Sequence, residues 1–367
     1  MPGPGAAVSR GAPEAHSRGD DLGADLPTDA FLRALPKAEL HVHLDGSLRA
    51  GTMAALARDR GVELPSHEPG ALAAHMLVSD AHSLEEYLAR FVLTLAVMQD
   101  AEALARKAYE LAEDHARESV RYVEVRFYPA LCTQEGMLPH EVLEAVLRGL
   151  ARAEGDFPVL TRVIVCALRT LDPVVSVEMA ALAVAYRDRG VVGFDLAGAE
   201  AGNPVDEHLE AFGLAGAADL ACTVHAGEGF GAPSVHQAVH LAGATRIGHG
   251  TRLREDPELE ALVRSRRIPL EVCLTSNVQT TVAPSYAAHP VRRYADLGIP
   301  VVLCTDNRLL SGVTLTDEYR HARDHLGFGR QELLRIARTG FEVAFAEPWQ
   351  REAMLEGFDA EVRKLAV

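Results

Sequence analysis

Residues 300–306 read PVVLCTD, a short apolar run that ends in a carboxylate, and residues 39–44 read ELHVHL, a second run that carries two histidines. Runs that are apolar on both faces are typical of parallel strands covered by helices, so they predict an α/β fold. In an open sheet, groups on the first and last strands usually lie far apart. In a closed barrel these strands are neighbours, so His41, His43 and Asp306 can meet at one mouth.

Eight strand candidates run through the chain, each beside a segment with helical periodicity. The strands are expected at 39–44, 121–127, 160–168, 191–196, 222–225, 245–248, 269–273 and 300–304, with helices among others at 104–116, 141–153, 177–187 and 208–214. Eight β/α repeats predict a (β/α)8 TIM barrel with a mostly helical insertion after the first strand, at residues 51–119. A doubly wound open sheet is the alternative, because strand counting from one sequence is error-prone.

The composition is that of a globular chain without a basic stripe. The chain has 367 residues, 48% of them hydrophobic, and a net charge of −16, which argues against binding to nucleic acid or to an anionic membrane. It has five cysteines and no C-x-x-C pair, a pattern that suits a reducing cytoplasm. It also lacks an apolar stretch of about 18 residues, so no membrane span is expected. Residues 1–26 are expected to be a disordered leader before a single domain of residues 27–367.

Residues of metal-binding types fall at or just past the ends of predicted strands. These are His41 and His43 in the first strand, His225 with Glu228 after the fifth, His249 after the sixth and Asp306 after the last. A lone H-x-H pair is weak evidence for a metal site. The further histidines and carboxylates expected at the same barrel mouth strengthen the prediction of a metal site. Three imidazoles and one carboxylate suit Zn²⁺ with an open position for water. The residues alone therefore predict a metal-dependent hydrolase.

Six motifs between Leu35 and Phe345 carry a family resemblance. They are KAELHVHLDGS (37–47), YVEVR (122–126), DLAG (195–198), TVHAGE (223–228), RIGHG (246–250) and CTD (304–306). In these motifs, and in the 24-residue spacing from His225 to His249, the chain resembles the adenosine deaminase family of the amidohydrolase superfamily. The resemblance implies a zinc-dependent hydrolase of purine salvage, with a small purine nucleoside as its partner. The implied reaction converts adenosine and 2′-deoxyadenosine to inosine and 2′-deoxyinosine plus ammonia.

The resemblance also implies catalytic roles. The ligands of one zinc ion per chain would be His41, His43, His225 and Asp306. Zinc lowers the pKa of water, so that the water can attack near neutral pH. Glu228 would protonate purine N1, and His249 would orient the attacking oxygen and stabilise the charge that develops on it. The alternative for Glu228 is an acid that caps the next helix. A non-catalytic binding protein of the same fold is a further alternative, although every ligand and Glu228 are present.

The substrate-binding residues follow from the same resemblance. Asp45 would hydrogen-bond a sugar hydroxyl, which favours a nucleoside over a free base, although it could also be a turn residue before Gly46. Gly198 would present its backbone N–H to purine N3, although a glycine there could simply form a turn. The residues Leu84, Tyr87, Leu88 and Phe91 lie at i, i+3, i+4 and i+7 of an expected helix. These four side chains would form a lid over the sugar, or they would pack in the hydrophobic core.

Asn307 departs from the family pattern, in which a second Asp follows the ligand Asp and faces purine N7. An asparagine offers both a donor and an acceptor, so it can donate directly to a neutral N7 and adenine remains a plausible ligand. The residues that follow, RLLS at 308–311, also differ from the commoner family sequence. Another 6-aminopurine, such as aminodeoxyfutalosine or free adenine, is therefore an alternative substrate. The sequence leaves the preferred nucleoside and the oligomeric state open.

Overall fold

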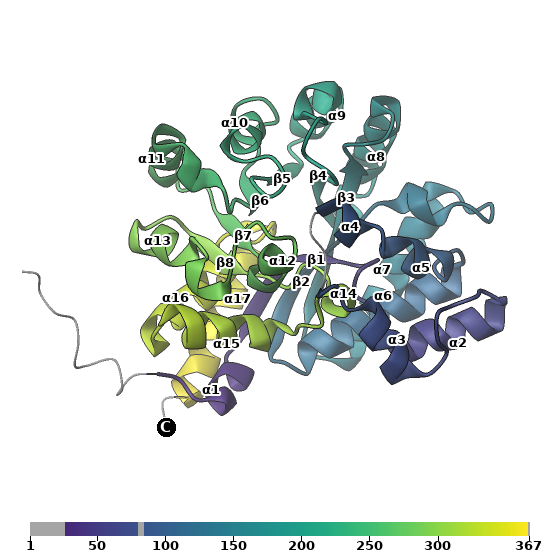
Figure 1. Ribbon diagram of the computed structural model, residues 1–367, viewed down its shortest axis with the longest axis horizontal. Helices are drawn as coiled ribbons and strands as arrows, with labels where there is room; N and C mark the ends of the chain where they lie inside the picture. The colour runs from purple at the N-terminus through teal and green to yellow at the C-terminus, as the bar shows by residue number, and fades with distance from the viewer. Residues whose placement is uncertain (1–25, 80–83, 366–367) are drawn as a thin grey trace, which may run out of the picture.

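Eight parallel strands form one sheet in the order β1 to β8, which confirms the predicted barrel (Figure 1). The computed structural model describes residues 26–79 and 84–365, so nearly all of the leader predicted for residues 1–26 lies outside the described residues. The strands are β1 Lys37–His43, β2 Val120–Phe127, β3 Leu160–Leu168, β4 Val191–Ala197, β5 Ala221–Ala226, β6 Arg246–His249, β7 Leu270–Val272 and β8 Val301–Leu303. Each differs from its predicted range by at most two residues at either end.

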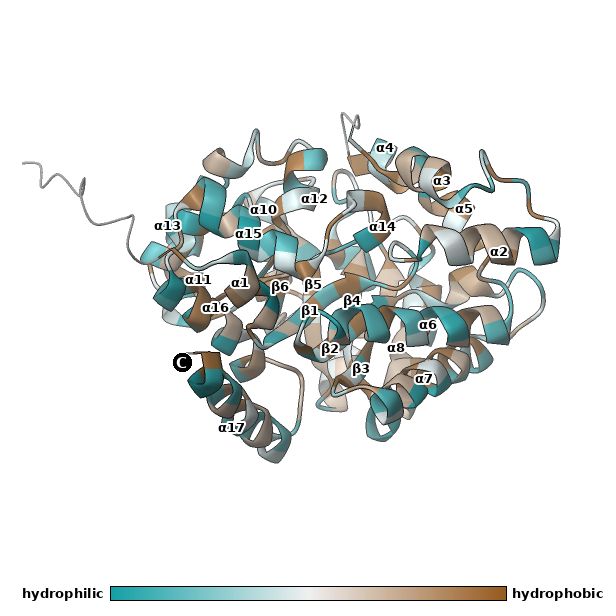
Figure 2. Cartoon of the chain, turned by 90° about the horizontal axis from the view of Figure 1, so that it is seen from below, coloured by the Kyte–Doolittle hydropathy of each residue, from teal (hydrophilic) through white to brown (hydrophobic). Residues whose placement is uncertain are grey.

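Helices surround the sheet and bury their apolar faces against it. Their bounds are α1 Asp29–Ala34, α2 Ala50–Arg60, α3 Pro69–Met76, α4 Leu84–Leu88, α5 Phe91–Ala96, α6 Ala101–Ala116, α7 Pro139–Asp156, α8 Pro173–Ala185, α9 Leu209–Ala217, α10 Ala232–His240, α11 Pro257–Ser265, α12 Leu274–Gln279, α13 Val291–Asp296, α14 Arg308–Ser311, α15 Leu315–Leu326, α16 Arg330–Glu342 and α17 Pro348–Leu365. Figure 2 shows hydrophobic residues on the central strands and hydrophilic residues on the outer helices, as expected for a covered parallel sheet. Within the described ranges, no helix has the length and apolar character needed to cross a membrane.

The insertion after the first strand is helical, as predicted, and comprises α2 to α6. The expectation of one continuous helix from Leu84 to Phe91 is wrong, because α4 ends at Leu88 and α5 begins at Phe91. The chain tightens between them, where the N–H of Arg90 reaches the carbonyl of Tyr87 three residues back instead of four. The apolar stripe is thus shared by two short helices.

The barrel closes through the backbone of the proposed metal ligands. The N–H of His43 donates to the carbonyl of Asp306 at 2.7 Å, and the N–H of Asp306 donates to the carbonyl of His41 at 2.9 Å. A parallel bridge pairs Val42 with Asp306 at the same place. The first and last strands are therefore neighbours, which rules out the open sheet and brings residues 265 positions apart to one site.

Candidate active site

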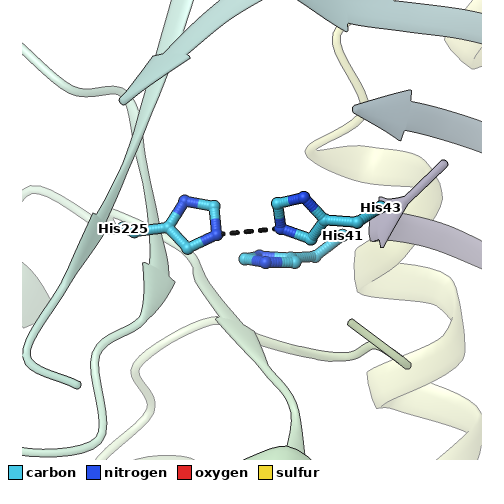
Figure 3. A group of neighbouring side chains, drawn as sticks. All are labelled: His41, His43 and His225. Carbon is cyan, nitrogen blue, oxygen red and sulfur yellow. Dashed lines mark hydrogen bonds between the residues drawn. The ribbon is translucent and has the colours of Figure 1, made fainter. Parts of the chain in front are cut away.

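Three histidine side chains converge at the carboxyl end of the barrel (Figure 3). The Nε2 atoms of His43, from β1, and His225, from β5, lie 3.1 Å apart. The Nε2 atom of His41 is buried without a hydrogen-bond partner. One oxygen of Asp306 lies 3.6 Å from Nε2 of His41 and 3.5 Å from Nε2 of His43. Donor atoms of His41, His43 and His225 lie within 4.8 Å of one another, and so do those of His41, His249 and Asp306. Two overlapping groups that share His41 thus gather imidazoles and a carboxylate in one place, as a metal site requires.

Buried carboxylates determine which nitrogen of two histidines faces that point. Nδ1 of His41 lies 2.9 Å from Glu271, and Nδ1 of His225 lies 3.0 Å from Asp195. An ionised carboxylate only accepts hydrogen bonds, so each Nδ1 carries the proton and each Nε2 presents a lone pair. Histidines that bind metal ions are held in the same way.

Arg126, on β2, connects the two carboxylates inside the barrel. Its guanidinium donates to Asp195 at 3.0 Å and to Glu271 at 2.7 Å, and all three side chains are fully buried. Burial raises the pKa of Asp195, but His225 and Arg126 outweigh it and hold that pKa well below its usual range. None of these three residues was assigned a role from the sequence. The available signal was a single charged residue in an otherwise apolar strand, Asp195 in β4 and Glu271 in β7, whereas β2 carries two further charged residues besides Arg126.

The electrostatic environment fits a divalent cation. Burial lowers the pKa of His41 and His43 well below the usual value, with Arg126 and the neighbouring histidines adding to the effect. The imidazoles are therefore neutral, and this is the form that binds a metal ion. Burial raises the pKa of Asp306, and a bound cation would oppose that shift by favouring the carboxylate. The nitrogen-rich donor set fits zinc.

Two of the site residues hold an unusual backbone conformation. His249, the last residue of β6, has φ of 62°, and Asp306, just past β8, has φ of 59°. The left-handed region is uncommon for residues with a side chain, and such residues cluster at functional sites. Two of the polar side chains at the barrel mouth thus come from residues with a strained backbone.

Glu228 follows β5 and lies beside the histidine cluster. Its Oε2 atom is 3.6 Å from Nε2 of His249, and the hydroxyl of Thr280 donates towards Oε1 at 3.5 Å. Its own N–H donates to Glu200 at 2.9 Å, so a buried carboxylate fixes this turn. The N-cap of the next helix, α10, is Gly231, three residues after Glu228.

A short helix that sequence analysis overlooked supports three of the site residues. From α12 and its C-cap, Ser276 donates to Asp306 at 2.6 Å, Asn277 contacts His249 at 3.0 Å and Thr280 faces Glu228. The start of α12 is in turn held by Glu318, whose carboxylate accepts the N–H groups of Leu274 and Thr275. No motif in the sequence marks these contacts, because each joins residues about 28 to 52 positions apart.

A cavity of about 290 Å³ opens above the cluster. Its walls include every predicted substrate-binding residue: Asp45, Leu84, Tyr87, Leu88, Phe91, Gly198 and Asn307. The cavity also reaches Glu228, His249 and all the predicted ligands except His41, which is fully buried. A larger cavity, of about 840 Å³, includes residues at the amino ends of β4 and β5 and none of the predicted site residues. Barrel enzymes work at the carboxyl ends of their strands, so the smaller cavity is the candidate site.

The side chains of α4 and α5 roof this cavity and also pack as core. The hydroxyl of Tyr87 lies 2.9 Å from that of Ser311 on α14, so α4 is tied to the opposite wall. Tyr87 is 1% exposed, and its ring meets that of Phe91 in an edge-on contact. Near this contact Asn307 packs over Gly46, where any larger side chain would collide with its amide. The lid and core interpretations of this stripe are therefore compatible.

Comparison with known proteins assigns the family. A sequence model of the adenosine deaminase family matches residues 36–361. The chain belongs to this family. It is 42% identical over 339 residues to an adenosine deaminase of Mycobacterium marinum, covering 88% of this chain and 93% of that protein. A probable adenosine deaminase of Dictyostelium discoideum is 41% identical over 320 residues, covering 87% of this chain and 41% of that longer protein.

Two solved structures share the fold of this chain. An adenine deaminase from Arthrobacter aurescens superposes with a TM-score of 0.84 at 27% identity, covering 90% of this chain and 99% of that one. An amidohydrolase from Burkholderia ambifaria with bound zinc superposes with a TM-score of 0.82 at 28% identity, covering 94% of this chain and 96% of that one. The proteins that this chain resembles are thus named for more than one purine substrate, adenosine in one and adenine in another.

Proposed function

We propose that this protein catalyses the zinc-dependent hydrolytic deamination of adenosine and 2′-deoxyadenosine, releasing ammonia. The observation that carries the proposal is the cluster at the floor of a cavity of about 290 Å³, where donor atoms of His41, His43 and His225 lie within 4.8 Å of one another and Asp306 lies 3.6 and 3.5 Å from His41 and His43. Glu228 and His249 reach the same cavity, so an acid and a hydrogen-bonding group lie beside the donor atoms. The M. marinum relative, named an adenosine deaminase, supports the choice of substrate.

The mechanism assigns one task to each group. His41, His43, His225 and Asp306 would hold the zinc ion. Bound there, zinc would lower the pKa of water and supply a nucleophile near neutral pH. Glu228 gives a proton to purine N1, which draws electrons from C6 and opens it to attack. A C–O bond forms at C6 and the C6–N6 bond breaks. Of the two protons of the attacking water, one leaves with the amino group as ammonia and the other restores the acid form of Glu228, so adenosine and water become inosine and ammonia. His249 holds the attacking oxygen and stabilises its charge.

Asp45 and Asn307 favour a nucleoside with an adenine base. Asp45 lines the cavity with its carboxylate 3.9 Å from Nδ1 of His43, where it can accept a hydrogen bond from a sugar hydroxyl. Asn307 lines the cavity next to Asp306 and can donate to purine N7. Gly198, which has φ of 94°, directly follows β4 at the cavity wall and can offer its N–H to purine N3. A cytoplasmic setting is proposed as well, supported by five buried cysteines that form no disulfide.

Adenine is the second candidate substrate, because the A. aurescens neighbour is an adenine deaminase and Asn307 departs from the usual family residue. The test is the ultraviolet absorbance change of the zinc-loaded protein with adenosine, 2′-deoxyadenosine, adenine and aminodeoxyfutalosine side by side. Rapid conversion of adenosine to the inosine spectrum is the expected result. Turnover of only adenine or aminodeoxyfutalosine would keep the mechanism and change the substrate. No absorbance change with any of the four compounds, with zinc bound, would favour a non-catalytic binding protein.

A further inference from the structure

Asn277, on α12, is fully buried between two histidines and makes a hydrogen bond on each side. Its Nδ2 atom lies 3.0 Å from Nδ1 of His249. Its Oδ1 atom lies 2.7 Å from the hydroxyl of Thr251 and 3.1 Å from Nε2 of His289. His289 is 3% exposed and lies outside the cavity, so it has no direct part in binding a substrate.

The direction of these hydrogen bonds is fixed from one end, by a backbone group. The N–H of Val291 lies 3.2 Å from Nδ1 of His289, and a backbone N–H can only donate. Nδ1 of His289 is therefore an acceptor, and in a neutral ring the proton must be on Nε2. Burial lowers the pKa of His289 to about 3, which keeps the ring neutral at physiological pH.

The amide of Asn277 extends this fixed hydrogen-bond direction to the active site. Because Nε2 of His289 donates, the atom of Asn277 that faces it must be the carbonyl oxygen. The other end of the amide is then the NH2 group, and it donates to Nδ1 of His249. An acceptor at Nδ1 leaves the single proton of a neutral ring on Nε2. That nitrogen points into the cavity, 3.6 Å from the carboxylate of Glu228.

We propose that Asn277 and His289 are positioning residues that hold His249 as the Nε2–H tautomer. His249 then donates a hydrogen bond to the attacking oxygen and does not accept a proton from it. The catalytic meaning of this tautomer rests on the proposed deamination, whereas the tautomer itself is a property of the resting protein. A donor aimed at developing negative charge stabilises the transition state, while the opposite tautomer would turn a lone pair towards that charge.

The experiment is long-range ¹⁵N–¹H NMR of zinc-loaded, ¹⁵N-histidine-labelled protein, with His249 assigned by the loss of its signals in His249→Gln. The expected spectrum of the unmodified protein has a protonated Nε2 and an unprotonated Nδ1 on His249. A protonated Nδ1 would overturn the proposal without any further variant. Because no substrate is present, this result is independent of whether adenosine is the substrate. Failure of the proposed function would appear separately, as absent turnover with the expected tautomer.

Asn277→Asp supplies the matched perturbation, because it keeps the shape but replaces the NH2 donor with an acceptor. The proton of His249 should move to Nδ1, and kcat should fall by about 10²-fold or more while KM and zinc content stay within about threefold, as when a triad carboxylate is replaced by its amide. Thr251→Val is the control, since it removes a donor to the same oxygen but leaves the His289 contact intact. It should retain the tautomer and kcat. A protonated Nε2 or an unchanged kcat in Asn277→Asp would refute the role.

Discussion

Replacing Lys107 with methionine measures how much the burial of one amine lowers the free energy of unfolding of this protein. Lys107 lies on α6, is 2% exposed and has the thioether of Met98 as its hydrogen-bond partner at 2.9 Å. A thioether is a weak acceptor, so it compensates little of the desolvation of an ammonium group. Methionine has a similar length and carries no charge, so the substitution removes the charge and leaves the packing nearly unchanged.

The magnitude follows from the pKa of the amine. Burial lowers the pKa of Lys107 from 10.5 to about 7, although the charges of Asp45 and Cys132 act in the opposite direction. Between pH 7 and 10.5 the unfolded chain therefore binds one proton more than the folded protein. The free energy of unfolding rises with pH across this window by about 1.4 kcal/mol per unit, or about 5 kcal/mol in total as an upper bound. Below pH 7 both states are protonated, and the folded protein bears the whole desolvation penalty.

The assay is urea denaturation of the zinc-loaded protein and of Lys107→Met at pH 6 and pH 10. The variant should be more stable at pH 6, by up to about 5 kcal/mol, and this advantage should nearly vanish at pH 10. Lys37→Met is the matched comparison, because burial also lowers the pKa of Lys37 to about 7, but its amine donates to the carbonyls of Leu32 and Leu35 at 2.9 and 2.8 Å. The same pH dependence is expected for this variant, with the gain at pH 6 smaller by about 1–3 kcal/mol because the two carbonyls lose their donor. A loss of stability in Lys107→Met at pH 6 would refute the reasoning and show that Asp45 compensates the charge.

Two further predictions concern the metal site and the lid. Asp306→Ala should lower the zinc content measured by elemental analysis while the circular dichroism spectrum is kept, because it removes the one carboxylate facing the three imidazoles; unchanged zinc would contradict its role as a ligand. Tyr87→Phe should raise KM for adenosine about 3- to 10-fold with kcat retained, because it removes the hydrogen bond to Ser311 that ties α4 over the cavity. Equal KM values for the two proteins would show that this contact does not hold the lid.

The sequence could predict those parts of the site in which the residue type alone indicates the chemistry. His41, His43 and Asp306 were identifiable because few other residues bind zinc, and because they occupy strand ends. The same residues favoured a closed barrel over an open sheet, and the backbone bonds between β1 and Asp306, just past β8, bear this out. The cavity then gathers the predicted substrate residues at one mouth, although the structure alone does not test their individual roles.

The parts of the site that the sequence could not predict depend on how side chains are oriented in the folded barrel. Arg126 and Glu271 lie on strands 145 positions apart, and only the closed barrel brings the guanidinium to the carboxylate. The role of Asn277 depends on which end of its amide faces His249, which a residue type does not reveal. The break between α4 and α5 was missed because an apolar stripe at helical spacing is the same whether one helix or two carry it.

The central claim is that Glu228 donates the proton needed for deamination, and that Glu228 is not one of the ligands of the zinc ion. The most direct test is to measure zinc content and adenosine turnover on the same samples of the unmodified protein and Glu228→Gln. The amide keeps the size of the side chain but loses the acid, so the account predicts one zinc per chain in both proteins and a fall in kcat of about 10²- to 10⁴-fold in the variant. Full turnover by Glu228→Gln with zinc bound would contradict the account.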